Sequence, residues 1–296
     1  MGVRDRVVAA PGCVRPSRPV SGRFPTPSER GGTGRRAGFT NLHGLLRKAL
    51  VDAVKRGRVR RNVADLVEAP GSERPTHRWW SPEELRAFVT HVRGDRLYAA
   101  WLLFVTTGMR RGEVAGLAWD DTDLRTGVLT VNWQLGVLDS KATFKPRPKS
   151  KAGARTMSLD PATVESLREH RRHQLEERIA AGPIWRDEQT DHLGTSRTGL
   201  VFTWEDGSLI HPERFSTWFR RHCSEAGLPT IRLHDVRHSY ASAGLANAAG
   251  WHEVKIISER LGHANVAITI DTYSHVLPAA DAATAHTLAK LILGGP

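Results

Sequence analysis

The sequence predicts a mainly helical α+β protein, in which a short helical region precedes a larger domain with a small antiparallel sheet. Apolar residues recur at helical spacing before residue 70 and again over most of residues 81–296. Runs rich in β-branched residues with polar alternation are confined to residues 128–159, which indicates a small sheet. Residues 1–39 show neither pattern.

The first 39 residues are expected to be a disordered basic leader. They carry seven Gly and five Pro, and eight Arg against Asp5 and Glu29 give them a charge of +6. Such a segment cannot bury enough apolar surface to offset the entropy lost on ordering. It could be a DNA-binding tail or a leader without function.

Residues 40–70 are expected to form two helices. An apolar stripe at i, i+3, i+4 and i+7 spacing begins near Thr40, and Asn62 is a plausible N-cap for a second, short helix that ends before Pro70. The stripe comprises Leu42, Leu45, Leu46, Ala49, Leu50, Ala53 and Val54, and the basic face comprises Arg47, Lys48, Lys55 and Arg56. The basic face could contact phosphates, although such faces are often only solvated. Residues 71–80 form a linker.

The larger domain, residues 81–296, begins with a helix start signal. Ser81-Pro82-Glu83-Glu84 reads as a capping box with Pro at the first helical position, and Leu85, Phe88, Val89 and Val92 would face inward. The next helix, from about Asp95 to Thr107, is almost wholly apolar and is expected to be buried. Gly108 is expected to end it and to place Arg110 at the start of the following helix.

The rest of the domain is expected to contain the sheet and a second set of helices. Asp160-Pro161 caps a long helix to about Ala181, residues 182–199 read as an irregular loop, and residues 200–204 read as a short buried strand. Pro212 opens a helix that bears Phe215, Trp218 and Phe219, and the remainder is expected to be helical.

Composition limits the classes of function. The chain of 296 residues has 43 Lys and Arg against 31 Asp and Glu, which gives a net charge of +12 and favours a polyanionic partner such as nucleic acid. Cys13 and Cys223 are too few to suggest a disulfide framework or a zinc site, and they indicate a reducing compartment. Apolar runs are too short for a spanning helix or a signal peptide, so a cytoplasmic location without membrane contact is expected.

One stretch near the end of the chain carries groups suited to phosphodiester chemistry. His234 and Arg237 are three residues apart and share a helix face, and Leu261-Gly262-His263 is followed ten residues later by Tyr273. A phenol can attack phosphorus, a guanidinium can stabilise charge on phosphoryl oxygens, and imidazoles can move protons.

These motifs resemble the tyrosine recombinase (phage integrase) family, whose signature is His-x-x-Arg, Leu-Gly-His and then a nucleophilic Tyr. The chain also has Thr107-Gly108-Met109-Arg110-Arg111-Gly112-Glu113, similar to the first Arg segment of the family, and residues 148–159, similar to its Lys-bearing hairpin. The resemblance covers roughly residues 40–290. It implies an integrase-type catalytic domain at 81–296, preceded at 40–70 by the last two helices of a partial core-binding domain.

The resemblance also implies roles for individual residues. Arg110 and Arg237 would bind the non-bridging oxygens of the scissile phosphate, a task suited to the fork geometry of Arg, and Glu113 would orient Arg110. Tyr273 would be the nucleophile, and His234 and His263 the two imidazoles. Lys149 would be the general acid, with Lys151 as the runner-up or a DNA contact. An ion pair of Arg110 with Glu113 or Asp120 is the purely structural alternative.

The function implied is site-specific DNA recombination through a 3′-phosphotyrosine intermediate, without metal or cofactor. Double-stranded DNA with attachment-like sites would be the substrate and a tetramer the active assembly, and an accessory DNA-bending or excision factor is compatible with this. An apolar helix at 278–293 would pack into a neighbouring protomer or, as the alternative, dock on its own domain. A truncated, catalytically weak DNA-binding remnant is the alternative, and a type IB topoisomerase fits the motif spacing less well.

Overall fold

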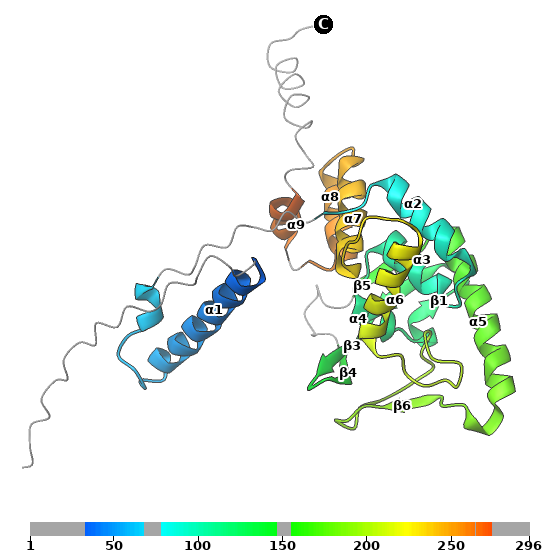
Figure 1. Cartoon of the computed structure of the whole chain (residues 1–296), viewed down its shortest axis with the longest axis horizontal. Coiled ribbons are helices and arrows are strands. Elements are labelled where there is room, and N and C mark those ends of the chain that lie inside the picture. Colours follow the sequence, from blue (N-terminus) through cyan, green and yellow to red (C-terminus); the bar gives the residue numbers. More distant parts are fainter. Residues whose placement is uncertain (1–32, 68–77, 147–154, 264, 274–296) are drawn as a thin grey trace, which may run out of the picture. The chain divides into compact units, whose positions relative to one another are not determined.

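The computed structural model describes residues 33–67, 78–146, 155–263 and 265–273 (Figure 1). The chain divides into two compact units, Met1–Thr76 and His77–Pro296. The expected leader up to residue 32, most of the linker, the Lys149–Lys151 segment and the tail after Tyr273 lie outside the described residues.

The first unit contains helix α1 (Thr33–Lys55) and the 3₁₀ helix η1 (Val63–Leu66). Helix α1 begins seven residues earlier than the expected start near Thr40. Asn62 is the N-cap of η1, as predicted, and its side chain accepts from the Ala64 N–H at 3.0 Å. The side chains of Leu42, Leu45 and Leu46 on the predicted apolar stripe are exposed.

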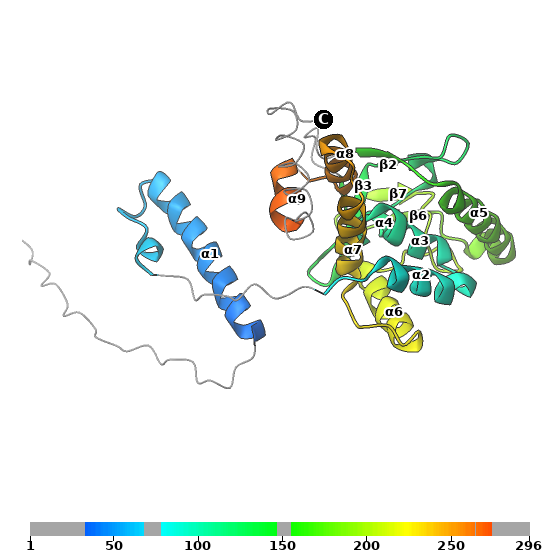
Figure 2. The same cartoon turned by 90° about the horizontal axis from the view of Figure 1, so that it is seen from above.

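The described residues of the second unit form helices around a common core, with three small sheets (Figures 1 and 2). Its α-helices are α2 (Pro82–His91), α3 (Tyr98–Thr107), α4 (Arg111–Ala115), α5 (Pro161–Ala181), α6 (Pro212–Glu225), α7 (Leu233–Ala246), α8 (Trp251–Leu261) and α9 (Val266–Tyr273). Its 3₁₀ helices are η2 (Val92–Gly94), η3 (Trp119–Asp121) and η4 (Gly182–Ile184). Its strands are β1 (Thr122–Asp123), β2 (Val128–Val131), β3 (Trp133–Leu138), β4 (Lys141–Pro146), β5 (Arg155–Ser158), β6 (Glu188–Thr190) and β7 (Ser196–Thr198).

The predicted helix signals are confirmed at the start of this unit. Ser81 and Glu84 form the capping box of α2, with Pro82 at the first helical position. Helix α3 starts at Tyr98, three residues later than expected, and is buried along most of its length against α2, α4, α5 and α7. It ends at Gly108, whose φ of 63° is left-handed. A Cβ at Gly108 would lie 2.8 Å from Tyr240 Cδ1, so close packing also requires glycine there.

Aromatic rings from α2, α3 and α6 form the centre of the core. Phe88 lies 5.2 Å from Phe219 and 6.0 Å from Trp101, measured between ring centroids, and Trp80 lies 5.3 Å from Phe88. These contacts join the first two helices of the unit to a helix more than a hundred residues later. Rings of this size dominate the apolar area that folding removes from water.

The sheets are antiparallel, as predicted, but the strand-like runs divide between two of them. Strands β1, β2 and β5 form one sheet in the order β1-β2-β5, and β3 pairs with β4 as a hairpin. Helix α4 packs so closely on β3 that a Cβ at Gly112 would lie 2.5 Å from the Leu135 carbonyl oxygen. This contact fixes the backbone next to Arg110.

Two local predictions were wrong. Residues 182–199 contain the hairpin β6–β7 rather than an irregular loop. The Gln189 side chain donates to the Gly207 carbonyl, so a remote backbone group stabilises this polar segment. Residues 200–204 are mostly buried but form no strand, and only the isolated bridges Ala118↔Leu200 and Thr203↔Leu209 pair this segment.

The remaining helices agree with the sequence. Asp160 caps α5, which forms one flank of the unit (Figures 1 and 2), and its side chain accepts from the Thr163 N–H at 3.0 Å. Helix α6 begins at Pro212 and buries Phe215 and Phe219. Within the described ranges, no helix combines the length and apolarity needed to cross a membrane.

Candidate active site

Helix α7 carries two side chains of the predicted site and a third, unassigned histidine on one face. His234, Arg237 and His238 are spaced i, i+3 and i+4, so the first turns of the helix present them together. The helix begins after Arg232, whose backbone N–H donates to the Asp235 carboxylate at 2.9 Å. The positions of these side chains therefore depend on a capped and well-defined helix start.

Arg237 connects the three sequence motifs. Its Nη1 donates to the Gly108 carbonyl at 2.8 Å, and its Nη2 donates to the Leu261 carbonyl at 2.5 Å. The side chain is buried, and burial, followed by the charge of Arg110, lowers its pKa to about 9. Among the described residues no carboxylate forms an ion pair with it, and a buried cation without such a partner is costly. An anion bound beside Arg237 would compensate this cost.

Arg110 lies directly before α4 and forms an ion pair with Glu113. Its Nη1 is 3.0 Å from Glu113 Oε1, and its backbone N–H donates to Oε2 at 2.9 Å. The predicted contact between these two residues is therefore present. The Arg110 side chain remains 37% exposed, so part of its guanidinium stays accessible to a ligand.

Glu113 also binds a second arginine that the sequence analysis did not identify. Arg155 on β5 forms a bidentate pair with Glu113, with N–O distances of 2.9 and 2.6 Å. Burial alone would raise the pKa of Glu113, but the hydrogen bonds and charge of Arg155, together with Arg110, lower it to about 2. The carboxylate is thus ionised at neutral pH and orients both guanidinium groups.

His263 follows α8, which ends at the left-handed Gly262 with φ of 66°. Its Nδ1 lies 2.8 Å from Thr269 Oγ1, and Thr269 in turn donates to Ser258 Oγ at 2.9 Å. Burial and the charges of Arg237 and Arg110 lower the pKa of His263 to about 4. His263 is therefore a neutral imidazole at pH 7, with its second nitrogen not engaged by Thr269.

Tyr273 ends α9 and is almost completely buried. Its hydroxyl oxygen lies 2.7 Å from His238 Nδ1, and the His238 ring lies edge-on to His234 with 5.3 Å between centroids. Burial raises the pKa of Tyr273 to about 12, although the charge of Arg237 opposes this. Desolvation of the ring, followed by the charges of His238 and Arg237, lowers the pKa of His234 to about 4 even though part of its surface stays exposed.

The structure brings together the predicted Arg110, Glu113, His234, Arg237, His263 and Tyr273. It adds Arg155 and His238, which the sequence analysis did not assign. His238 had a signal in the sequence, because it lies one turn after His234 on the same helix face. No feature of the sequence, apart from its positive charge, marked Arg155 as a site residue. Lys149 and Lys151 lie outside the described residues.

The predicted DNA contacts of the first unit are exposed on α1 and directly after it. They are Arg47, Lys48, Lys55 and Arg56. Arg47 Nε lies 2.5 Å from Asp65 Oδ1, so part of this charge is already paired.

Comparison with known proteins assigns the chain to a family. Residues 78–279 match the phage integrase family, and the chain belongs to that family. It is 32% identical over 222 residues to a "Tyrosine recombinase XerC-like" protein of Caldanaerobacter subterraneus, an alignment that covers 72% of this chain and 54% of the relative. It is 28% identical over 242 residues to the ICEBs1 integrase of Bacillus subtilis, covering 80% of this chain and 61% of that protein.

The fold is also similar to a solved structure. The Tn1549 transposon integrase, in complex with a circular intermediate DNA, superposes with a TM-score of 0.67 at 22% identity, covering 84% of this chain and 78% of that one. This likeness shows the mainly helical fold of the family. The chain spans about half to three fifths of the length of the two curated relatives.

Proposed function

We propose that this chain is a site-specific DNA recombinase in which Tyr273 is the nucleophile. The observation that carries the proposal is the hydrogen bond between the Tyr273 hydroxyl and His238, one residue after the buried cation Arg237. A phenol with a raised pKa needs a base to remove its proton and a cation to stabilise charge at phosphorus. Both are adjacent to it.

The phosphate would be bound by the two motif arginines. Arg237 has N–H groups beyond the two that bind the Gly108 and Leu261 carbonyls, and Arg110 is partly exposed. Glu113 and Arg155 would act through Arg110 by fixing its position. The ring of His234 would donate to a phosphoryl oxygen, and His263 would do so once the negative charge of the bound phosphate has favoured a proton on its second nitrogen.

In the chemical step, Tyr273 Oη attacks phosphorus and forms a 3′-phosphotyrosine ester, while the bond to the 5′ oxygen breaks. The phenolic proton passes to His238 Nδ1. The departing 5′ oxygen takes a proton from Lys149 or, as the runner-up, from Lys151. Reversal with a partner strand's 5′ hydroxyl would rejoin the DNA, so the step uses no external energy source.

The partners proposed are double-stranded DNA with attachment-like sites and further copies of this chain in a tetramer, with an accessory DNA-bending or excision factor as a compatible third partner. The net charge of +12 supports the first, because release of counterions from DNA favours binding of a basic protein. The exposed basic residues Arg47, Lys48, Lys55 and Arg56, and the partial core-binding domain at 40–70, would contribute phosphate contacts.

The test is incubation with a nicked attachment-site duplex that traps the covalent intermediate. A covalent protein–DNA complex should form, should persist in EDTA, and should be absent for Tyr273→Phe. An inactive DNA-binding remnant predicts DNA binding without any covalent complex. A complex that forms equally in Tyr273→Phe would show that another group is the nucleophile.

A further inference from the structure

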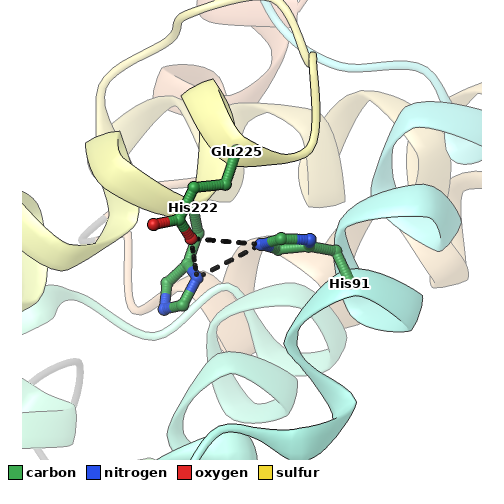
Figure 3. A group of neighbouring side chains, drawn as sticks. All are labelled: His91, His222 and Glu225. Atoms are coloured by element: carbon green, nitrogen blue, oxygen red, sulfur yellow. Dashed lines mark hydrogen bonds and ion pairs between the residues drawn. The ribbon is translucent and has the colours of Figure 1, made fainter.

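Two histidines and a glutamate converge where α2 meets α6, outside the proposed active site (Figure 3). His91 is the last residue of α2, and His222 and Glu225 lie three residues apart on α6. Their ligand atoms form a triangle. His91 Nε2 is 3.4 Å from His222 Nδ1, and Glu225 Oε2 is 3.5 Å from each of these nitrogens.

These distances match the edges of a tetrahedral metal site. An ion with bonds of about 2.0–2.2 Å to nitrogen and oxygen separates tetrahedral ligand atoms by about 3.3–3.6 Å. Two imidazole nitrogens that face each other also share an unfavourable arrangement of lone pairs unless a proton or a cation lies between them. The geometry therefore fits a cation at the centre of the triangle.

His222 has a carboxylate beside its second ring nitrogen, as metal-bound histidines usually do. Its Nε2 lies 3.2 Å from Asp95 Oδ2, an ion-pair distance without hydrogen-bond geometry. The negative charge of Asp95 favours the ring proton on Nε2, which leaves a lone pair on Nδ1, the nitrogen that faces His91 and Glu225. Asp95 is itself fixed, because its other oxygen accepts from the Leu97 N–H at 2.8 Å and from Trp101 Nε1 at 3.1 Å. The Trp101 ring also packs edge-on against His222, with 5.5 Å between centroids.

The site is accessible from solvent on one side. His222 is buried, whereas the side chains of His91 and Glu225 are 29% and 49% exposed. An ion could therefore enter from the surface and keep a water as its fourth ligand. One neighbour opposes binding: Arg221 Nε lies 3.5 Å from Glu225 Oε1, the oxygen that does not face the histidines.

We propose that His91, His222 and Glu225 bind one divalent transition-metal ion, with Asp95 as the outer partner that orients His222. Two imidazoles and one carboxylate are ligands that suit zinc. The ion would join the end of α2 to the end of α6. The role is structural, since none of these residues contacts the proposed catalytic groups.

Titration of the untagged, EDTA-treated protein with Co²⁺ and with Zn²⁺ tests the proposal. Co²⁺ should give the visible absorption of a tetrahedral site, and Zn²⁺ should displace it with a stoichiometry of one. Saturating Zn²⁺ should raise the melting midpoint by ~3 °C or more, because it binds only the folded state.

Variants locate the bound ion. His91→Ala and Glu225→Gln change partly exposed side chains and should lose the absorption band and the thermal shift. Asp95→Asn, which can still accept from Leu97 and Trp101, should weaken Zn²⁺ affinity by ~10–100-fold. His252→Ala, an exposed histidine on α8, is the matched control and should bind as the unchanged protein does.

The variants are needed because other histidines could bind the added ion. His234, His238 and His263 cluster near Tyr273 and could also attract an ion. If Co²⁺ binding is absent, or is unchanged in His91→Ala, the proposal is overturned, and the triangle is then a hydrogen-bonded His–His–Glu group. Cleavage by the EDTA-treated protein below its melting temperature is measured separately, so failure of the metal site and failure of the recombinase proposal give different results.

Discussion

The two halves of the proposed active site are stabilised in different ways. Arg110, Glu113 and Arg155 form an ionic network beside the large core that includes Met109, Val114 and Met157, and Glu113 and Arg155 are buried in it. Tyr273 instead belongs to a small second cluster with residues of α7 and α8. Helix α9 buries only Thr269 and Tyr273, and each of them is hydrogen-bonded to a site histidine.

This difference matches the two tasks of the proposed site: the arginines that bind the phosphate must be fixed, whereas Tyr273 must move to reach it. Charge stabilisation is most effective when donors are preorganised, which a buried network achieves. The proposed nucleophile, Tyr273, lies on a short helix with few buried side chains, which is typical of elements that open at low free-energy cost. Because Tyr273 is almost fully buried, we expect α9 to shift when a phosphate binds.

The largest effect is expected when the network is broken. Glu113→Gln would remove the charge that compensates the buried Arg155, and loss of one partner of a buried ion pair destabilises by about 3–5 kcal/mol. Chemical denaturation measures the change in free energy of unfolding. Glu259→Gln is the matched control, because its carboxylate is exposed and 3.9 Å from Lys255, and it should change stability by less than ~0.5 kcal/mol. A small effect of Glu113→Gln would mean that the surroundings of Arg110 and Arg155 adapt as easily as α9.

The next effect concerns chemistry rather than stability. Arg110→Ala should reduce single-turnover cleavage by ~10²–10³-fold, the scale for removal of one preorganised donor. The fold should survive, since Arg155 still pairs with Glu113. Arg111→Ala is the matched control, because its guanidinium donates to Ser216 and not to Glu113. Equal losses in both variants would assign the effect to general DNA binding.

Local signals explain which parts of the fold could be predicted. The capping box of Ser81 and Glu84, the Asp160 cap and the Gly108 terminus each depend on residues within a few positions of each other. The hairpin β6–β7 was missed because the buried side chain of Gln189 binds a carbonyl 18 residues away. A polar segment gives no sign of such a contact.

In the site, too, contacts between residues far apart in the sequence could not be predicted. The motif spacing predicted Arg110, Arg237, His263 and Tyr273, because the family resemblance assigns them by position. Arg155 is 42 residues from Glu113, and His91 is 131 residues from His222, so no spacing rule connects them. Pairings of this kind follow only from the tertiary fold, which brings Arg155 of β5 to Glu113 of α4 and packs α2 on α6.

A smaller effect is expected in the nucleophile half. If His238 accepts the phenolic proton, His238→Ala should reduce cleavage at pH 7 by ~10²-fold, the low end for loss of a general base. The deficit should shrink as the pH rises, because hydroxide then forms the phenolate that attacks. A pH–rate profile of the variant beside the unchanged protein measures this. A deficit that is constant from pH 7 to pH 10 would show that His238 only positions α9.

The smallest effect is the dependence of stability on mild acid. The pKa of His263 is about 4 in the folded protein, against an ordinary value of 6.5. Between these values the unfolded chain binds a proton that the folded chain does not, so unfolding becomes easier as the pH falls from 6.5 to 4. Because His263 is only partly buried, solvent screening limits its contribution to about 1 kcal/mol. Above pH 6.5 this stability is fully present.

His263→Gln should therefore flatten the fall in unfolding free energy between pH 6.5 and 4. Glu113 contributes in a different window, because its pKa is lowered from 4.5 to about 2 and its stabilisation is lost only below pH 4.5. Urea denaturation at half-unit pH steps separates the two. If His263→Gln leaves the slope above pH 4.5 unchanged, desolvation of His263 does not contribute to acid sensitivity, and the nucleophile half is more hydrated than its contacts indicate.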